Sequence, residues 1–415
     1  MSKRKMGHDL IGALDVGSSK VCCFIAHADE AGLNVVGIGH QVARGLRAGA
    51  VVDMAAADHS IMTAVHAAEQ MAGERIRSVY MNFSAGNPAS LRVEVDVAVN
   101  GHEINDGDIR RLLGQGSARC EPDGREVIHT IPLSYTIDGN RGIREPRGLF
   151  GDRLGVNIHV ITAEPGPMRN LTACVAHSHL DIAARVVSPY ASGLACLVED
   201  EIDLGATLLE MGGGTTGVAV FLDGEVVHTD VVPIGGNHIT NDIARGLSTS
   251  IEHAARMKSL FGSAIPSPAD ERETIDVRLV GESEDAGPNP VPRSQLVSII
   301  RPRIEETLEL VRNRLEASGF GHAAGRRLVI TGGASQLQGL RELAGQMLGK
   351  HVRLSRPLTI AGLAEATAGP AFSTCAGLLI YALRQRRDVP PKALGALEGV
   401  GGRLGRVGQW LRDNL

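Results

Sequence analysis

The hydrophobic positions of the chain fall in short runs, and two groups of runs share one pattern. Residues 11–14 are apolar, residues 15–20 (DVGSSK) are mostly polar and contain a glycine, and an apolar run resumes at 21–26. This alternation predicts two strands joined by a tight turn. The same order returns at 207–222, where an apolar strand is followed by an acid, a glycine-rich turn and a second apolar run. The repeat predicts two structurally similar halves.

The second half continues with another strand and two helical patterns. The apolar residues 327–331 predict a strand that runs into a glycine pair, after which a helix opens. The apolar face of that helix consists of Leu337, Leu340 and Leu343. Residues 295–317 predict a long helix, in which Pro302 marks either the start or a kink. Residues 263–292 are rich in proline, serine and acids, which predicts an exposed excursion.

The segment between the two similar patterns belongs to neither of them. It has an alternating strand at 91–97, a polar helix near 106–115, and two further strands at 126–132 and 156–161. This mixture predicts a small α+β subdomain inserted into the first half.

The last residues of the chain have the pattern of a helix that lies in a membrane surface. One helical face would carry Leu404, Val407, Trp410, Leu411 and Leu415. The other faces would carry Arg403, Arg406, Gln409, Arg412 and Asp413. The preceding segment 388–402 contains proline and glycine and gives the helix reach. The alternative is a helix that docks on its own domain, but a net basic polar face in a chain of net charge −5 favours the membrane.

Composition narrows the class of protein. A chain of 415 residues with 43% hydrophobic residues is globular and long enough for two large lobes. Its slightly acidic, dispersed charge argues against nucleic acid as the main partner. Six cysteines without a CxxC pair are typical of a reduced, cytosolic protein. The basic start is interrupted by charges too early for a signal peptide, and no run approaches the ~20 apolar residues of a spanning helix.

The two acid-led hairpins carry the candidate chemistry. Glycine turns expose consecutive backbone N–H groups that bind phosphate oxygens, and an acid before each turn can hold the hydration shell of Mg²⁺. A single glycine-rich turn is usually only a turn. Two acid-led hairpins followed by a third glycine turn at 331–334 form a more specific signal for a nucleotide.

These motifs resemble the actin/heat-shock chaperone/sugar kinase ATPase superfamily. The segments that resemble its first phosphate loop, second phosphate loop, adenosine motif and two connecting helices are 15–20, 210–216, 331–334, 188–195 and 372–378. Within the superfamily the chain resembles the FtsA family of bacterial cell-division proteins. The segments that carry this closer resemblance are 128–138 and 146–149 in the insert, 233–242, and the C-terminal helix.

The resemblance implies an α/β, actin-like two-lobed ATPase fold with an inserted α+β subdomain and a C-terminal amphipathic helix. The implied limits are 8–81 and 163–204 for the core of the first lobe, 82–162 for the inserted subdomain, 205–232 and 296–385 for the core of the second lobe, 233–295 for the upper second lobe, 386–402 for a flexible linker, and 403–415 for the membrane-targeting helix.

The resemblance also implies a site for ATP and Mg²⁺. The implied nucleotide-binding residues are Asp15, Gly17, Ser18, Ser19, Lys20, Glu210, Gly212, Gly213, Gly214, Thr215, Thr216, Gly235, Gly236, Asn237, Lys258, Gly332, Gly333 and Ala334. Asp15 and Glu210 would hold the metal through water.

Three positions depart from the family pattern. The second phosphate loop opens with Glu210 where the family has Asp, which moves the carboxylate by about 1.5 Å. Ser188 stands where active relatives carry Glu, and Ala255 stands where the family commonly has Glu. Each change removes or moves an acid that would position Mg²⁺ or the attacking water, so we predict slow or negligible hydrolysis.

The implied role is a scaffold that polymerises at the division site, on the cytoplasmic face of the inner membrane. The basic and apolar residues of the terminal helix would bind an anionic membrane surface. A single helix should bind reversibly, and a filament of several copies should bind tightly. The upper second lobe would grip the acidic C-terminal tail of FtsZ, and the candidate residues are Arg293, Arg301 and Arg303. Later division proteins would contact the insert.

Three other readings fit the sequence less well. A sugar-kinase-like phosphotransferase would need a catalytic base, and no further acid stands out near the phosphate loops. A heat-shock ATPase would need a peptide-binding domain, and too little sequence follows Ala382. A pilus-assembly actin homologue lacks the C-terminal anchor. His129, His159 and His253 show no metal-ligand spacing and are predicted to be core or surface residues.

Overall fold

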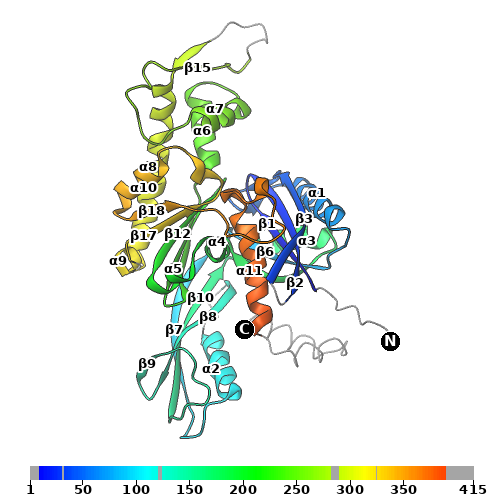
Figure 1. Cartoon of the computed structure of the whole chain (residues 1–415), viewed down its shortest axis with the longest axis vertical. Coiled ribbons are helices and arrows are strands. Elements are labelled where there is room, and N and C mark those ends of the chain that lie inside the picture. Colours follow the sequence, from blue (N-terminus) through cyan, green and yellow to red (C-terminus); the bar gives the residue numbers. More distant parts are fainter. Residues whose placement is uncertain (1–8, 30–31, 120–123, 282–288, 324, 389–415) are drawn as a thin grey trace.

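A computed structural model describes residues 9–29, 32–119, 124–281, 289–323 and 325–388. Figure 1 shows two sheets side by side, an inserted subdomain at one end of the molecule and a helical unit at the other. The predicted helix 403–415 and most of the predicted linker lie outside the described residues. In the described part, no helix combines the length and the apolar character needed to cross a bilayer.

The first sheet carries the first predicted hairpin at its centre. Its strands, in spatial order, are β11 (Asp181–Val187), β6 (Ser78–Phe83), β1 (Asp9–Val16), β2 (Lys20–Asp29) and β3 (Gly32–Val42). The helices α1 (Met54–Ala72) and α3 (Pro165–His177) pack beside it, and a short ribbon follows β3, made of β4 (Leu46–Arg47) and β5 (Ala50–Val51). Gly39 lets α1 approach β3, because a Cβ there would lie 1.9 Å from the Ala64 carbonyl oxygen.

The second sheet repeats the first. Its strands are β14 (Glu225–Val232), β13 (Thr216–Leu222), β12 (Ala206–Met211), β17 (Arg327–Thr331) and β18 (His351–Leu354). In both sheets the hairpin strands are antiparallel, and the first hairpin strand runs parallel to its other neighbour. The matching strand order confirms the prediction of two similar halves.

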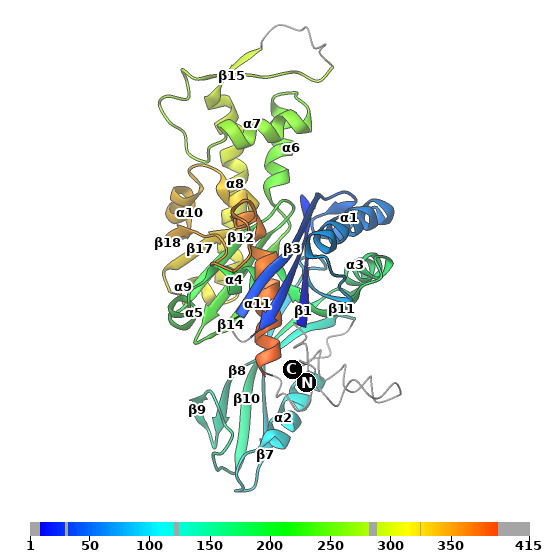
Figure 2. The ribbon, with the colours of Figure 1, turned by 45° about the vertical axis from the view of Figure 1, so that its right-hand side comes forward.

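Two helices cross between the sheets. They are α4 (Ser188–Cys196) and α11 (Ser373–Asp388), which follows the 3₁₀ turn η3 (Pro370–Phe372). Figure 2 shows α11, in orange, between the two sheets. The helices touch at Gly377, where a Cβ would lie 1.8 Å from the Ala191 carbonyl oxygen. Only glycine permits this close crossing.

Helices form the upper second lobe and flank the second sheet. They are α5 (Glu199–Leu204), α6 (Gly236–Gly246), α7 (Ile251–Phe261), α8 (Arg293–Ala317), α9 (Phe320–Ala323) and α10 (Leu340–Leu348), with 3₁₀ turns η1 (Gly333–Gln336) and η2 (Glu365–Thr367). The predicted long helix is α8, and Pro302 lies inside it.

One local prediction in this region was wrong, and another was incomplete. The helix predicted directly after the glycine pair begins only at Leu340, because Gly332 and Gly339 have φ of +93° and +76° and interrupt the helical path. The described part of the segment 263–292 is mostly exposed, as predicted, but it is not without structure. It contains the short strands β15 (Thr274–Asp276) and β16 (Pro290–Pro292), and Ile275 is buried.

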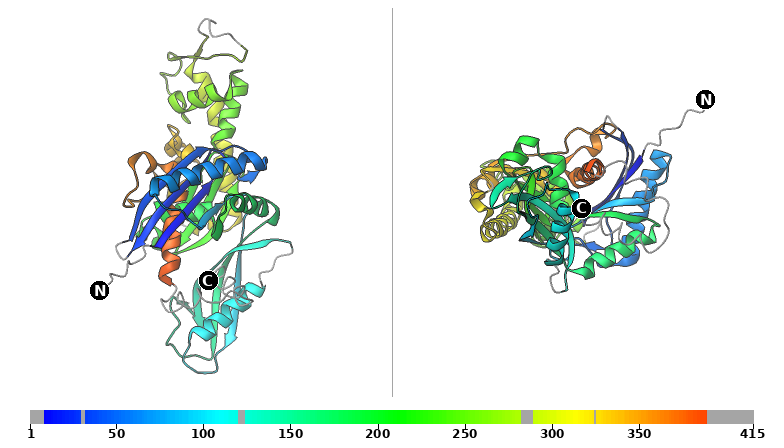
Figure 3. Two further views of the ribbon diagram at one scale, coloured as in Figure 1. Left: turned by 90° about the vertical axis from the view of Figure 1, so that its right-hand side faces the viewer. Right: turned by 90° about the horizontal axis from the view of Figure 1, so that it is seen from below.

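The insert has its own sheet and core. Its strands, in spatial order, are β7 (Ala89–Ala98), β10 (Arg153–Ala163), β8 (Glu126–Ile137) and β9 (Asn140–Ile143), and α2 (Asp106–Arg119) packs on them. Figure 3 shows the insert, in cyan, at the end of the molecule opposite the upper second lobe.

Two buried histidines lie where the insert meets the lobes. His159 Nδ1 is 2.8 Å from the Val226 carbonyl oxygen of β14, and His129 Nε2 accepts a hydrogen bond from the Val187 N–H of β11 at 3.2 Å. Burial lowers the pKa of His129 to about 3 and that of His159 to about 4, so both rings are neutral core residues.

Candidate functional site

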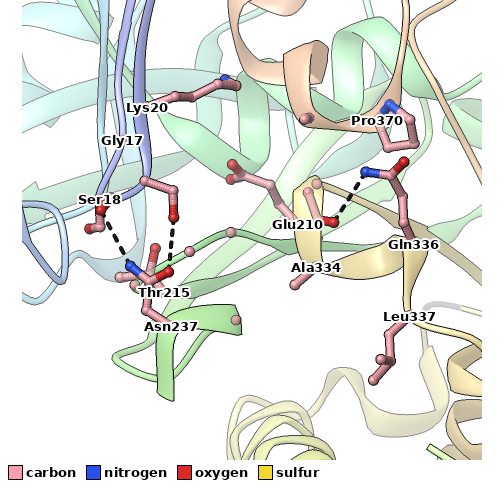
Figure 4. Close-up of a pocket in the computed structure, with 18 of the residues that line it drawn as sticks. Gly17, Ser18, Lys20, Glu210, Thr215, Asn237, Ala334, Gln336, Leu337 and Pro370 are labelled. Atoms are coloured by element: carbon pink, nitrogen blue, oxygen red, sulfur yellow. Dashed lines mark hydrogen bonds between the residues drawn. The ribbon is translucent and has the colours of Figure 1, made fainter. Parts of the chain in front are cut away.

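A cavity of about 610 Å³ lies between the two lobes. Its walls come from the turns of both central hairpins, from the start of α6, from the end of α7 and from η1 and α11. Figure 4 shows the loop around Gly17 and Ser18 facing Thr215 and Asn237, with Glu210 between this region and Ala334. The size is that of a small-molecule site.

Asp15 is the acid of the first hairpin, and its own lobe holds it in place. It is buried at the end of β1, where its Oδ1 accepts a hydrogen bond from Asn82 Nδ2 at 2.9 Å. Asn82 also accepts from the Val16 N–H at 2.7 Å and donates to Ser188 Oγ at 3.1 Å. Asp15 Oδ2 pairs with Lys20 Nζ at 3.0 Å. Burial alone would lower the pKa of Lys20, but the charge of Asp15 and its hydrogen bond help to hold that pKa above its ordinary value.

Glu210 is the acid of the second hairpin, and it has a different environment. Its Oε1 accepts a hydrogen bond from Thr374 Oγ1, in the first turn of α11, at 2.8 Å. Burial and the charge of Asp15 raise the pKa of Glu210 to about 8, although Thr374 and Lys20 act in the opposite direction. Without a bound cation, Glu210 therefore keeps its proton near neutral pH, and a cation beside it would favour the ionised form.

The glycine turns of the two lobes touch across the cavity. Ser19 Oγ donates to Asn237 Oδ1 at 3.0 Å, and Asn237 Nδ2 donates to the Ser18 carbonyl oxygen at 3.3 Å. A Cβ on Gly213 would lie 1.9 Å from Ser19 Oγ, and one on Gly214 would lie 2.4 Å from Ser18 Oγ. Bare glycine backbone is therefore required for the loops to approach each other.

The part of the cavity wall formed by α6 and α7 contains a second lysine, Lys258. Lys258 Nζ donates to the Gly236 carbonyl oxygen at 2.9 Å and to Thr240 Oγ1 at 2.8 Å, and burial lowers its pKa. These bonds fix the start of α6 against the end of α7. On the opposite side, Gly332 lies so close to β12 that a Cβ there would be 2.4 Å from the Met211 carbonyl oxygen.

The structure brings nearly all of the predicted nucleotide-site residues to this cavity. All of them line it except Thr216 and Gly235. Thr216 is fully buried in β13 and donates to the Ile234 carbonyl oxygen at 2.8 Å, while Gly235 packs against the Gly212 carbonyl oxygen.

Several polar residues of the wall had not been predicted as binding residues, and Asn82 and Thr374 are the two that bond to the acids. Asn82 lies near the carboxyl end of β6, next to the first hairpin. The sequence could have indicated this position. Asn82 lies near the carboxyl end of an apolar strand, and the carboxyl ends of parallel strands meet at one edge of a sheet, where Asp15 also lies.

The predicted tail-binding arginines are already paired with carboxylates of the second lobe. Arg293 bonds Asp270 Oδ1 at 2.8 Å and its side chain is 14% exposed. Arg301 pairs with Glu305 at 2.7 Å, and Arg303 pairs with Asp242 at 2.6 Å. An acidic ligand would therefore compete with these internal carboxylates.

Two similar sheets, two crossing helices and an acid-lined cleft between the lobes define an actin-like protein. Solved structures with this fold agree. One, titled PilM-PilN type IV pilus biogenesis complex, has a TM-score of 0.63 at 17% identity and covers 90% of this chain and 98% of its own. MreB5 of Spiroplasma citri bound to ADP has a TM-score of 0.54 at 12% identity and covers 92% and 99%.

Sequence comparison gives the family. A model described as cell division protein FtsA matches residues 207–377, and a model of the SHS2 domain inserted in FtsA matches residues 85–162. Cell division protein FtsA of Rhizobium meliloti (strain 1021) is 43% identical over 419 residues, which cover 98% of this chain and 95% of that protein. The chain belongs to the FtsA family of cell-division proteins. The predicted family and the predicted actin-like two-lobed fold with an inserted subdomain are both confirmed.

Proposed function

We propose that this chain is an ATP-binding, actin-like scaffold of the division apparatus, which polymerises on the inner membrane and tethers the FtsZ ring to it. The observation that carries the proposal is the cavity between the lobes, where two acid-led glycine hairpins face each other. MreB5 of Spiroplasma citri, which shares the fold, is titled as bound to ADP in one structure and to AMPPNP in another.

The residues of the cavity fit ATP and Mg²⁺. Glycine backbone at 17, 212–214 and 332–333 lines the cavity without side chains, which leaves room for phosphate oxygens close to the backbone. Lys20 supplies a permanent positive charge. Asp15 and Glu210 supply the carboxylate oxygens that Mg²⁺ prefers, here through its bound waters. When bound, the metal neutralises phosphate charge, and the chain's own residues orient the nucleotide.

We further propose that hydrolysis is slow. The position where active relatives carry Glu is occupied by Ser188, whose hydroxyl accepts a hydrogen bond from Asn82. A serine at this position is a weaker base for an attacking water than a carboxylate. Ala255, in α7, offers no polar group at all.

Membrane attachment is assigned to helix 403–415 and filament formation to self-association of the two-lobed body. The tail of FtsZ is assigned to the upper second lobe, 233–295, and later division proteins are assigned to the insert. Arg301 is the most exposed of the three arginines, with 42% of its side chain accessible, and is the best placed to exchange an internal carboxylate for one of the tail.

Co-sedimentation with anionic liposomes tests the scaffold. The full chain and a chain that ends at Val400 are compared with and without Mg-ATP. We expect only the full chain to pellet, and to pellet more with Mg-ATP. Leu411→Glu should abolish pelleting, whereas Gln409→Glu, which adds the same charge on the polar face, should retain most of it. Equal behaviour of the full and truncated chains would contradict membrane attachment through this helix.

A further inference from the structure

The second phosphate loop carries a longer acid than its family pattern, and the structure shows what the extra length reaches. Glu210 Oε1 accepts the hydroxyl proton of Thr374, with the two oxygens 2.8 Å apart. Thr374 belongs to α11 and lies 164 residues further along the chain, and it is almost completely buried. An Asp at position 210 would end about 1.5 Å earlier and would not make this bond.

Thr374 is itself held firmly. Its Oγ1 is 2.9 Å from Ser192 Oγ, which is fully buried in α4. The preceding Ser373 lies 2.6 Å, oxygen to oxygen, from Thr331 at the end of β17. A threonine hydroxyl has one proton, so when that proton goes to Glu210 the hydroxyl can only accept from Ser192. The direction of the Glu210 carboxylate is therefore set by the crossing of α4 and α11.

The bond leaves half of the carboxylate for a ligand. Among the described residues, no hydrogen bond reaches Oε2 of Glu210, and the residue lines the cavity together with Asp15 and Lys20. Figure 4 shows the Glu210 side chain extended into the open space between the lobes. A carboxylate with one oxygen fixed and the other free presents a defined acceptor to the waters of a metal ion.

We infer that Thr374 is the positioning residue of Glu210: its hydroxyl fixes one carboxylate oxygen and turns the other toward the hydration shell of nucleotide-bound Mg²⁺, so that glutamate at this loop functions only together with Thr374. The inference rests on the proposed binding of Mg-nucleotide. It goes beyond that proposal because it assigns the metal-dependent part of the affinity to a side chain outside the phosphate loops.

The test separates metal-dependent from metal-independent binding. The dissociation constant of ATP is measured by calorimetry on the full chain, once with Mg²⁺ and once with EDTA, and the ratio of the two values is the Mg²⁺ gain. Thr374→Val should reduce the gain about 10-fold, the scale of a lost hydrogen bond to a charged group, and should leave the EDTA value within about 2-fold. Thr374→Ser, which keeps the hydroxyl, should retain the gain.

A second pair of variants tests whether Thr374 acts through Glu210. Glu210→Asp should lower the gain, and Thr374→Val added to Glu210→Asp should lower it no further, because the aspartate does not reach position 374. Thr374→Val alone would leave the buried hydroxyl of Ser192 without its partner, and adding Ser192→Ala removes that hydroxyl. Urea unfolding of the single and double variants then separates a folding defect from a binding defect.

Each outcome is decisive. An unchanged gain in Thr374→Val, an equal loss with Mg²⁺ and with EDTA, or a further loss in the Glu210→Asp background overturns the inference while the proposed nucleotide function stands. If the natural chain binds ATP equally well with Mg²⁺ and with EDTA, the inference is likewise overturned and the proposed nucleotide function stands. Absence of ATP binding under both conditions overturns the inference and the proposed function together.

Discussion

The two phosphate hairpins share a backbone but differ in how their acids are held. In each, the acid ends a strand that pairs with an antiparallel partner on one side and a parallel strand on the other. Asp15 has a lysine and an amide from its own lobe, whereas the hydrogen-bond partner of Glu210 among the described residues is a hydroxyl from α11. The two halves therefore share a fold, but the charges around their two acids differ. The first hairpin carries a permanent ion pair, and the second holds an acid whose charge depends on a ligand.

The largest effect should come from breaking the crossing of α4 and α11, on which the position of Glu210 depends. Gly377→Ala places a methyl group against the Ala191 carbonyl oxygen, and the backbone must move. We expect a loss of about 3 kcal/mol or more in the free energy of unfolding, measured with urea. Gly369→Ala is the matched control, because a Cβ there meets nothing within 4 Å. Equal stability of the two variants would show that the crossing is not closely packed.

The next largest effect concerns the free energy of unfolding when each of the two acids is replaced by its amide. Asp15→Asn leaves Lys20, whose side chain is 24% exposed, without its charged partner. We expect a loss of about 2 kcal/mol in the free energy of unfolding, less than for a fully buried pair. Glu210→Gln removes no such ion pair and should cost less than Asp15→Asn at pH 7. The reverse order in urea unfolding would contradict the distinction between the hairpins.

The pH dependence of Glu210 sharpens the comparison. Its pKa is raised to about 8 in the folded state, so the folded state binds its proton more tightly than the unfolded state. The free energy of unfolding should therefore fall as the pH rises from about 4.5 to about 8. Glu210→Gln lacks this loss, and between pH 5 and pH 8 it should gain stability relative to the natural chain with a slope of up to about 1.4 kcal/mol per pH unit. Thermal unfolding without nucleotide measures the difference, and parallel pH profiles would contradict it.

The smallest effect concerns the contact between the loops of the two lobes. Asn237→Ala removes the hydrogen bonds to Ser18 and Ser19, and should cost about 1 kcal/mol. Amide hydrogen exchange should become faster at 17–20 and at 212–215 together. Gln336→Ala, which removes a bond only to the nearby Gly333 carbonyl oxygen, should leave both segments unchanged. Faster exchange in one lobe alone would show that Asn237 does not couple them.

Local patterns were enough to predict the hairpins, the repeat and the insert. Apolar runs and glycine turns determine a strand pair within a few residues, so Asp15 and Glu210 were placed correctly at the ends of strands. The start of α10 was missed because the backbone at Gly332 and Gly339 has positive φ, which an apolar spacing does not reveal. Sequence spacing gives side-chain positions on a face but not the local path of the chain.

The partners of the site residues could not be predicted, because they come from distant segments. Asn82 reaches Asp15 over 67 residues, and Thr374 reaches Glu210 over 164. The same applies to Arg303, whose partner Asp242 lies on α6. The sequence predicted Arg293, Arg301 and Arg303 as candidates for an acidic tail, and the fold adds that each has a carboxylate partner within the chain. Pairing of charges is a property of the packed lobe.

Hydrogen exchange of the full chain upon titration with ATP tests the central claim, that one nucleotide is held by both hairpins and that the second depends on the metal. With Mg²⁺, we predict that 15–20, 210–215 and 332–334 become protected at the same ATP concentration. With EDTA, protection at 15–20 should persist and protection at 210–215 should be largely lost. Protection of neither hairpin, or equal protection of both without Mg²⁺, would contradict this account.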